Sequence, residues 1–312
     1  MKSLFITTLA GDDKGGAVGG WSWRKRVLIL TSIVVLLGGA TVACLYAFTD
    51  ILNPYNTLFG TGERVVDTGS RISREPTASG AELGVFAGYG QSNSDCCGSG
   101  PNPSSVEHSH KIFNFFTGAN TTTFEYKEPM LGAFCHGSCP YLKIGNELID
   151  AGMYDEVVFS TSGMPGAPLS MINGDEPAFP YFSYLVETYK GMLAKYGKVD
   201  GILFHQGESD NGKSDAYEAL FDSFLQNLAN EGIPVGGAGG AKIYVSRTTR
   251  CGYLEIDSAL SAVQLALADK DGVEEGPNTD TVSIDKRYRY DSCHFTQEGW
   301  DEVADLWLEK LT

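Results

Sequence analysis

The chain has 312 residues, of which 42% are hydrophobic and 20% charged, an ordinary globular composition that excludes a mainly disordered protein. Of its 23 basic and 39 acidic side chains, five and three lie in residues 1–50, so residues 51–312 carry a net charge of −18. Phosphate backbones bind basic surfaces, and we therefore expect no nucleic-acid partner.

The first predicted element is a membrane-spanning helix at residues 27–48. This segment contains no charged residue, and a helix of its length crosses the ~30 Å hydrocarbon core of a bilayer. Arg24, Lys25 and Arg26 precede it, so the positive-inside rule places residues 1–26 in the cytoplasm and the rest of the chain outside. A cleaved signal peptide is the alternative. We interpret the segment as a single-pass signal anchor with a lumenal, cell-surface or periplasmic C-terminal domain.

Residues 49–81 mix Gly, Pro, Ser, Thr and charged residues without a sustained period, and are predicted as a stalk. After this segment the sequence alternates between short apolar runs and amphipathic stretches, and residues 82–312 are predicted as one domain. Five apolar runs have the length of strands and mostly lack alternation, as in a sheet covered on both faces. They are residues 83–88, 156–161, 199–205, 242–246 and 281–284.

Between these runs lie stretches with apolar residues at three- and four-residue spacing, which is typical of amphipathic helices. They are residues 181–197, 214–232, 257–272 and 297–311. Strands that alternate with helices pair in parallel through right-handed crossovers. The expected fold is α/β, a three-layer α/β/α sandwich with a mainly parallel five-stranded sheet.

Six of the seven cysteines lie outside the membrane segment, where an oxidising compartment permits disulfides. They are Cys96, Cys97, Cys135, Cys139, Cys251 and Cys293. The sequence leaves their pairing open, and one hypothesis is a disulfide from Cys96 or Cys97 to Cys293.

A zinc site is the sharper alternative for part of this set. Cys135, His136 and Cys139 lie close together, with His108 and His110 upstream. The paired two-residue cysteine spacing of structural zinc sites is missing, so we expect no metal.

Ser92 lies directly after the first predicted strand, in the segment FAGYGQSNSD. A lone serine in a Gly-rich turn is usually structural. However, HQGESD (205–210) follows the third predicted strand and DSCHFTQEGW (291–300) the fifth. Ligands of open parallel sheets bind beyond the carboxyl ends of the strands. A Ser, a Gln, an Asp and a His therefore emerge at one edge, and nucleophilic ester cleavage needs such a set.

The motifs GQSN (90–93), HQGESD (205–210) and DSCH (291–294), in this order and at these strand ends, resemble the SGNH hydrolase superfamily. The resemblance is to its sialate O-acetylesterase and plant acetylxylan esterase-like branch, and it covers about residues 82–311. It implies a flavodoxin-like SGNH fold and a serine esterase that removes acetyl or other short acyl groups from carbohydrate, without a metal or organic cofactor.

The resemblance also implies the catalytic roles. Ser92 matches the nucleophile, His294 the general base and Asp291 the carboxylate that orients it. His294 would take the hydroxyl proton during attack and return it to the leaving sugar oxygen.

The oxyanion hole implied by the resemblance has three donors. They are the N–H of Ser92, the N–H of a glycine after the second strand, and the side chain of Gln206. Within SGMPGAPLS the glycine aligns most naturally with Gly166, but Pro165 departs from the double-glycine turn of the family, and Gly163 is an alternative.

Arg247, Arg250 and Glu208 are candidate substrate contacts, because arginine binds a carboxylate bidentately and Glu208 belongs to the HQGESD motif. Two alternative functions stay open. One is a lipid or aryl-ester hydrolase on the same fold, and the other is a glycan-binding protein with weak or lost turnover.

Overall fold

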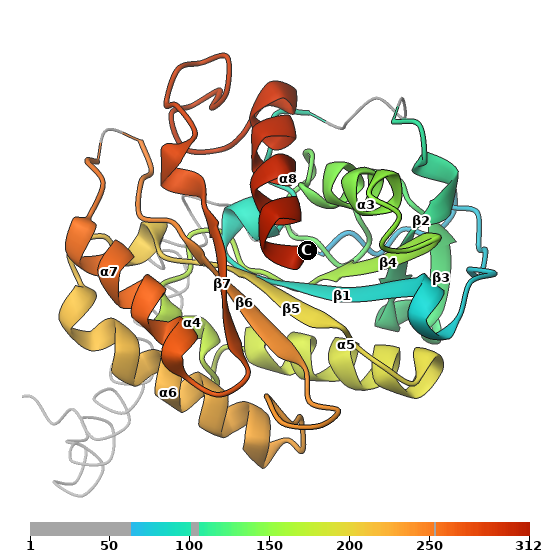
Figure 1. Ribbon diagram of the computed structural model, residues 1–312, viewed down its shortest axis with the longest axis horizontal. Helices are drawn as coiled ribbons and strands as arrows, with labels where there is room; N and C mark the ends of the chain where they lie inside the picture. Colours follow the sequence, from blue (N-terminus) through green and yellow to red (C-terminus); the bar gives the residue numbers. More distant parts are fainter. Residues whose placement is uncertain (1–63, 101–105, 253) are drawn as a thin grey trace, which may run out of the picture. The chain divides into compact units, whose positions relative to one another are not determined.

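A seven-stranded sheet forms the centre of the structure, a computed structural model that describes residues 64–100, 106–252 and 254–312. The strand order is β3-β2-β4-β1-β5-β6-β7, and every neighbouring pair is parallel except β2 and β3 (Figure 1). The strands are β1 (Leu83–Gly90), β2 (Ile112–Phe116), β3 (Thr122–Glu125), β4 (Glu156–Thr161), β5 (Gly201–His205), β6 (Lys242–Arg247) and β7 (Val273–Asn278).

Helices cover both faces of the sheet, as Figure 1 shows. α3 and α8 pack together on one face, while α5 and α7 contact β1 and β6 from the other face, beside α6. The helices are α3 (Tyr141–Asp150), α4 (Leu169–Ile172), α5 (Tyr181–Tyr196), α6 (Ser214–Asn230), α7 (Ser258–Ala266) and α8 (Gln297–Leu311). The predicted three-layer α/β/α arrangement is confirmed, with seven strands instead of five.

The fifth predicted strand, at residues 281–284, is wrong. The last strand forms earlier, as β7, and Thr281 already ends a 3-10 turn. The sequence of β7, VEEGPN, carries charge, glycine and proline, which do not indicate a strand. These residues are tolerated because β7 lies at the sheet edge and pairs only with β6.

β2 and β3 were not predicted, because Asn114 interrupts the apolar run of β2. Asn114 is fully buried, and the hydrogen bonds of its side chain are made inside the protein. Its Oδ1 accepts the Leu131 N–H at 2.8 Å, and its Nδ2 donates to the Phe115 carbonyl at 3.1 Å. A buried amide with these partners is compatible with a core strand.

Large aromatic side chains fill both interfaces between the sheet and the helices. Phe159 lies 5.9 Å from Phe86 and 5.3 Å from Tyr141, measured between ring centroids. On the other face Phe204 lies 5.4 Å from Phe224. Each fully buried ring stabilises the fold by about 1.5–3 kcal/mol, so the core fixes the strand ends that carry the site.

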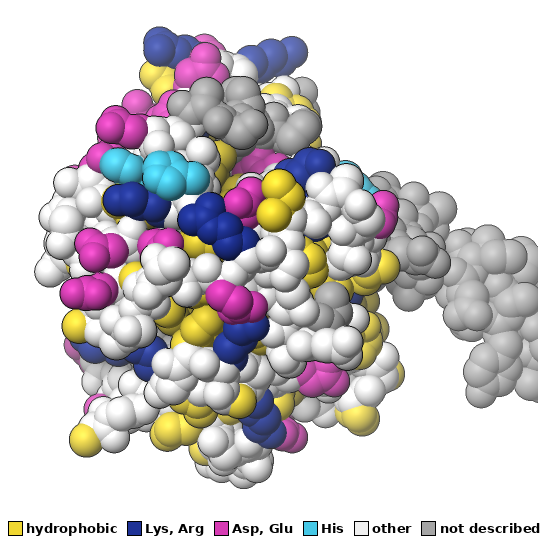
Figure 2. Space-filling model, turned by 90° about the vertical axis from the view of Figure 1, so that its right-hand side faces the viewer, with side chains coloured by type: hydrophobic (Ala, Val, Ile, Leu, Met, Phe, Trp, Pro, Cys, Tyr) yellow, Lys and Arg dark blue, Asp and Glu magenta, His cyan; other side chains and the backbone are white. Residues whose placement is uncertain are grey.

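Residues 64–81, predicted as part of the stalk, lie against the domain. The Val65 N–H donates to the Ala133 carbonyl at 2.7 Å, and Ser73 forms an antiparallel bridge with Phe124 of β3. Arg74 also contacts β3, through an ion pair with Glu125 (3.0 Å). On the face of the molecule shown in Figure 2, basic and acidic side chains are interspersed.

No helix among the described residues has both the length and the apolar character to cross a bilayer. The predicted membrane helix at residues 27–48 lies outside the described residues, as does most of the segment at 49–81.

Candidate active site

β1 delivers Ser92 to the carboxyl edge of the sheet. Gly90, at the end of β1, has a φ of +140°, and a Cβ there would lie 2.0 Å from the carbonyl oxygen of His205 at the end of β5. Only glycine lets the two central strands end this close together. Ser92 begins the next turn and is 3% exposed, and its carbonyl accepts the N–H groups of Asp95 and Cys97.

Asp291 and His294 form a hydrogen-bonded pair in the loop before α8. His294 Nδ1 lies 2.6 Å from Asp291 Oδ2, and Asp291 Oδ1 accepts the His294 N–H at 2.7 Å. A carboxylate at Nδ1 selects the tautomer whose Nε2 accepts a proton. Burial would raise the pKa of Asp291, but the hydrogen bonds from His294 and its charge lower that pKa to about 2. The carboxylate is therefore ionised at neutral pH.

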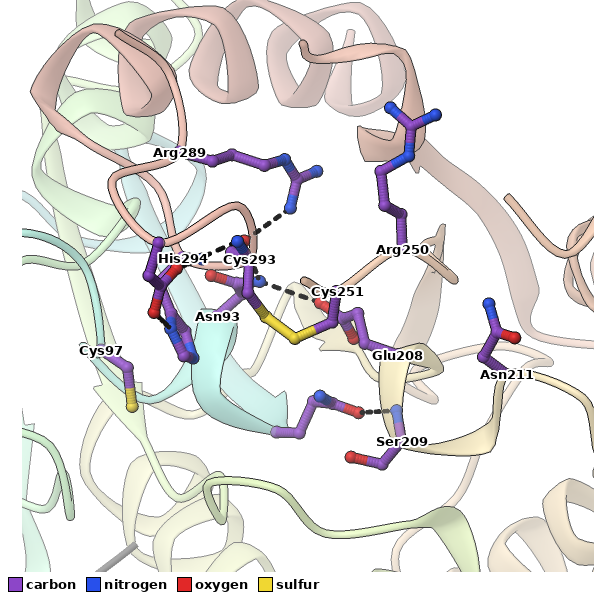
Figure 3. Close-up of a disulfide and its surroundings, with 12 residues drawn as sticks. Asn93, Cys97, Glu208, Ser209, Asn211, Arg250, Cys251, Arg289, Cys293 and His294 are labelled. Atoms are coloured by element: carbon purple, nitrogen blue, oxygen red, sulfur yellow. Dashed lines mark hydrogen bonds and ion pairs between the residues drawn. A yellow bond between two sulfur atoms is a disulfide. The ribbon is translucent and has the colours of Figure 1, made fainter. Parts of the chain in front are cut away.

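The loop that carries this pair lies against the turn that carries Ser92 (Figure 3). The Asn93 amide, next to Ser92, donates to the Cys293 carbonyl at 3.4 Å. The Ser99 N–H donates to the Phe295 carbonyl at 2.9 Å. The structure thus brings the three residues predicted as the catalytic triad to the same edge of the sheet.

Three disulfides surround these loops. They are Cys96–Cys139, Cys97–Cys135 and Cys251–Cys293. Cys293 pairs with Cys251 after β6, so the hypothesis of a bridge from Cys96 or Cys97 to Cys293 is wrong. Cys135 and Cys139 are oxidised, and the zinc alternative is wrong because disulfide sulfurs are not zinc ligands.

Glu208 is buried behind the site and contacts residues that position it, instead of lining it. It is 4% exposed, and its Oε1 lies 2.9 Å from Asn93 Nδ2 and 3.1 Å from His205 Nε2. Burial would raise the pKa of Glu208, but the charge of His205 and the hydrogen bonds from His205 and Asn93 hold that pKa at about 2. Glu208 thus fixes Asn93, the neighbour of Ser92.

The depressed pKa of Glu208 predicts an acid-labile contribution to stability. A carboxylate with a lowered folded-state pKa stabilises the fold above its ordinary value of 4.5, and this contribution is lost as the pH falls toward about 2. The urea midpoint of Glu208→Gln should therefore fall less over this pH range than the midpoint of the unchanged protein. The exposed Glu298→Gln is the control, and an equal fall for Glu208→Gln would contradict the prediction.

The backbone N–H groups of Ser92 and Gly163 donate no hydrogen bond to any residue that the structure describes. Gly163 is buried against the turn of Ser92, where a Cβ would lie 2.7 Å from Ser94 Oγ and 3.2 Å from the Gln91 carbonyl oxygen. Gly166 is less buried and has a φ of +69°. The Gly166 N–H also donates to no described residue, so the two glycines differ in burial and in the close packing of Gly163 against the turn of Ser92.

Gln206, the third predicted donor, is fully buried. Its Nε2 lies 2.6 Å from Asp210 Oδ2, and the Tyr217 hydroxyl donates to its Oε1 at 2.8 Å. The amide is held inside the protein by these contacts.

Arg247 is the last residue of β6, and Arg250 lies in the segment that follows it. Arg247 pairs with Glu275 at 3.4 Å. The Arg250 side chain extends away from His294 in Figure 3. Their predicted role in substrate binding gains no support from these positions.

Arg289 is a buried residue of the site that the sequence did not reveal, since RYRYDSCH reads as an exposed charged segment. Its Nη1 donates to the Cys293 carbonyl at 2.6 Å and its Nη2 to the Thr279 carbonyl at 2.7 Å. Burial lowers the pKa of Arg289 to about 10, and the charges of Glu208 and Asp280 oppose this fall. The cation thus holds the residue that precedes His294.

Arg289→Met should loosen this loop. It removes two hydrogen bonds from a charged donor to buried carbonyls, and each such bond contributes about 1.5–3 kcal/mol. We expect a lower free energy of unfolding in urea, with partial recovery in Arg289→Lys, whose ammonium reaches fewer acceptors. Equal stability of Arg289→Met and the unchanged protein would contradict the role of this residue.

Comparisons with known proteins agree with this geometry. The family model for carbohydrate esterases of the sialic acid-specific acetylesterase type matches residues 82–310. The chain belongs to this family. A search of curated proteins finds no match. The sialic acid-specific acetylesterase family thus confirms the predicted resemblance and the predicted enzyme class, a carbohydrate esterase.

Two solved structures have a similar fold. A protein from Arabidopsis thaliana is 15% identical with a TM-score of 0.58, and the match covers 74% of this chain and 98% of that one. NanS is 14% identical with a TM-score of 0.50, and the match covers 75% of this chain and 98% of that one. At these identities the likeness supports the fold of this esterase and not its substrate.

Proposed function

We propose that this esterase removes O-acetyl groups from carbohydrate by a Ser92–His294–Asp291 mechanism, outside the cytoplasm. The observation that carries the proposal is the hydrogen-bonded pair of Asp291 and His294 (2.6 Å), next to the turn of Ser92. A positioned base beside a serine and a carboxylate behind the base are the parts that serine acyl transfer requires.

In the proposed reaction Ser92 Oγ attacks the acetyl carbonyl carbon while His294 Nε2 takes the hydroxyl proton. Negative charge develops on the carbonyl oxygen, where the N–H groups of Ser92 and Gly163 stabilise it. The intermediate collapses, the bond to the sugar oxygen breaks, and His294 returns its proton to that oxygen. A water then attacks the acetyl-serine by the same route, releasing acetate and restoring Ser92.

Residues 27–48 are proposed to anchor the enzyme in a membrane, with the N-terminus in the cytoplasm. The uncharged segment after Arg24, Lys25 and Arg26 supports this. The three disulfides support an oxidising compartment for the esterase domain. Extraction of membranes with alkaline carbonate tests the anchor, and release of the full chain into the soluble fraction would contradict it.

The acyl preference tests the proposed substrate class. The full chain should hydrolyse p-nitrophenyl acetate faster than the butyrate and octanoate esters, and should release acetate from acetylated xylan or O-acetylated sialic acid. A preference for octanoate would favour a lipid hydrolase. Binding of these glycans without release of acetate would favour a glycan-binding protein.

A further inference from the structure

The loop that carries His294 is a short hairpin, residues 289–295. Arg289 and Phe295 form an isolated antiparallel bridge at its base. One residue further in, the Tyr290 N–H donates to the His294 carbonyl at 3.0 Å. Successive side chains of paired extended segments point to opposite sides. The pair Arg289–Phe295 therefore lies on one side of the hairpin, and the pair Tyr290–His294 lies on the other.

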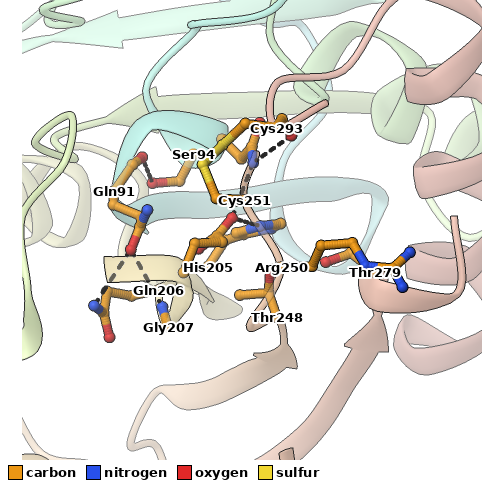
Figure 4. A network of polar contacts seen from close by, with 12 residues as sticks. Gln91, Ser94, His205, Gln206, Gly207, Thr248, Arg250, Cys251, Thr279 and Cys293 are labelled. Carbon is orange, nitrogen blue, oxygen red and sulfur yellow. Dashed lines mark hydrogen bonds and ion pairs between the residues drawn. A yellow bond between two sulfur atoms is a disulfide. The ribbon is translucent and has the colours of Figure 1, made fainter. Parts of the chain in front are cut away.

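The first pair fixes the hairpin in the protein. Arg289 and Phe295 are both fully buried, and the guanidinium carbon lies 4.0 Å from the centroid of the Phe295 ring. The disulfide of Cys293 with Cys251, drawn in Figure 4, ties the hairpin to the segment that follows β6. These contacts give the opposite side of the hairpin a fixed direction.

The second pair consists of two stacked rings. The Tyr290 ring and the His294 imidazole have their centroids 6.0 Å apart, with an angle of 26° between their planes. Tyr290 is 42% exposed, far more than the aromatic side chains of the core. Its burial therefore stabilises the fold less than theirs does. What distinguishes Tyr290 is its contact with the imidazole.

The hydroxyl of Tyr290 reaches the turn of Ser92. It donates to the Cys97 carbonyl at 3.2 Å, and the Cys97 N–H donates to the Ser92 carbonyl at 3.3 Å. Tyr290 is thus bound at both ends, by its backbone to His294 and by its hydroxyl to the turn of Ser92. These two anchors hold the ring against the imidazole.

We propose that Tyr290 is a positioning residue, whose ring holds the His294 imidazole in place for proton transfer and stabilises the imidazolium that forms. This inference rests on the proposed esterase function. As Ser92 Oγ bonds to the acyl carbon, its proton moves to His294 Nε2 and the imidazole becomes a cation. An aromatic ring attracts a cation within about 6 Å of its centroid. The attraction is greater for the imidazolium than for the neutral imidazole, so it favours the transition state over the free enzyme.

Tyr290→Leu and Tyr290→Phe test the proposal with p-nitrophenyl acetate, an ester without a sugar. Loss of the ring in Tyr290→Leu should lower kcat by about 3- to 30-fold, the usual range for a cation on an aromatic ring. Tyr290→Phe keeps the ring and should keep kcat within about threefold. A fall of less than about threefold in Tyr290→Leu, or equal falls in both variants, would overturn the proposal.

The change in KM separates positioning from substrate binding. A residue that acts through the base changes kcat and leaves KM nearly the same. If Tyr290→Leu raises KM and leaves kcat unchanged, Tyr290 is a substrate contact and the positioning role is overturned.

The stacking also has a spectroscopic signature. The chain has five histidines, and His294→Ala assigns the imidazole resonances of His294 in the labelled full chain. A stacked aromatic ring shifts the resonances of protons above it. The His294 ring protons should therefore move in Tyr290→Leu and stay near their original positions in Tyr290→Phe. Unchanged His294 resonances in Tyr290→Leu would contradict the stacking.

Tyr154→Leu is the matched control. Tyr154 is also partly exposed, but its ring lies 5.9 Å from that of Phe86 and packs at Gly84, near the start of β1 and at the opposite edge of the sheet. The control should lower the unfolding temperature and leave kcat of the folded protein within about threefold. A fall in kcat as large as that of Tyr290→Leu would overturn the proposal.

Ser92→Ala separates this proposal from the proposed function. If Ser92→Ala is inactive while Tyr290→Leu keeps kcat within about threefold, the positioning role is overturned and the esterase stands. If Ser92→Ala keeps full turnover, the proposed function itself fails, and the role of Tyr290 fails with it.

A measurement on the unchanged chain guards against a variant that does not fold. In a crystal structure of the full chain after reaction of Ser92 with a fluorophosphonate, the Tyr290 ring should remain stacked on the His294 imidazole, with centroids about 6 Å apart. Separation of the two rings, with His294 still directed at Ser92, would overturn the proposal.

Discussion

His294→Ala is expected to lower kcat for p-nitrophenyl acetate by up to roughly 10⁶-fold, the effect of removing the base from a serine hydrolase triad. Without the imidazole, Ser92 keeps its proton and is a weak nucleophile. The pair with Asp291 and the position beside the Ser92 turn give His294 this role. Binding of the ester should change much less than turnover.

The exposed His136 offers a matched control, since it lies in the loop that is joined to Cys97 through Cys135. His136→Ala should keep kcat within about threefold. Initial rates measured at substrate saturation decide the matter, and a His294→Ala enzyme with more than a tenth of the original kcat would contradict the assignment.

Asp291→Asn is expected to lower kcat by roughly 10⁴-fold while the fold is preserved. An amide at this position favours the tautomer in which His294 Nδ1 lacks its proton, so Nε2 carries one and does not act as a base. It also removes the negative charge that stabilises the imidazolium. Because the pKa of Asp291 is about 2, the unchanged enzyme keeps this charge over the whole neutral range.

Asp285→Asn is the control for this change, because Asp285 is exposed and lies six residues earlier in the same segment. Circular dichroism should give the same unfolding temperature within a few degrees for both variants. Loss of activity in Asp291→Asn through unfolding, or retention of more than a tenth of kcat, would contradict the proposed orienting role.

The loop with His294 is fixed around Cys293, which is held from several directions. Its N–H donates to Asp291 Oδ1 at 3.0 Å, and its carbonyl accepts hydrogen bonds from Arg289 at 2.6 Å and Asn93 at 3.4 Å. Its sulfur is bound to Cys251. Such constraints lower the reorganisation that a base needs before it acts, which favours catalysis.

The sequence predicted the residues that lie at strand ends, because the rule for parallel sheets needs only the order of the elements. Ser92 follows β1 and His294 follows the last strand, so both lie at the predicted edge of the sheet. This holds although the last strand was predicted at residues 281–284 and forms at Val273–Asn278. The position of each motif after a strand was enough to predict that these side chains meet, because both loops lie at the same edge of the sheet.

Contacts between distant segments could not be predicted in this way. The partner of Cys293 is Cys251, 42 residues away, and the partners of Arg289 are backbone carbonyls, which carry no sequence signal. The close packing of Gly163 against the turn of Ser92, which distinguishes it from Gly166, also depends on contacts between distant segments. Only the folded arrangement of the chain determines these pairings.

The central claim is that Ser92 is the nucleophile of a carbohydrate acetylesterase. It is tested most directly by measuring acetate release from acetylated xylan and O-acetylated sialic acid, with the full chain and Ser92→Ala side by side. The account predicts release by the unchanged chain and none above background by Ser92→Ala. Equal release by both proteins would contradict it.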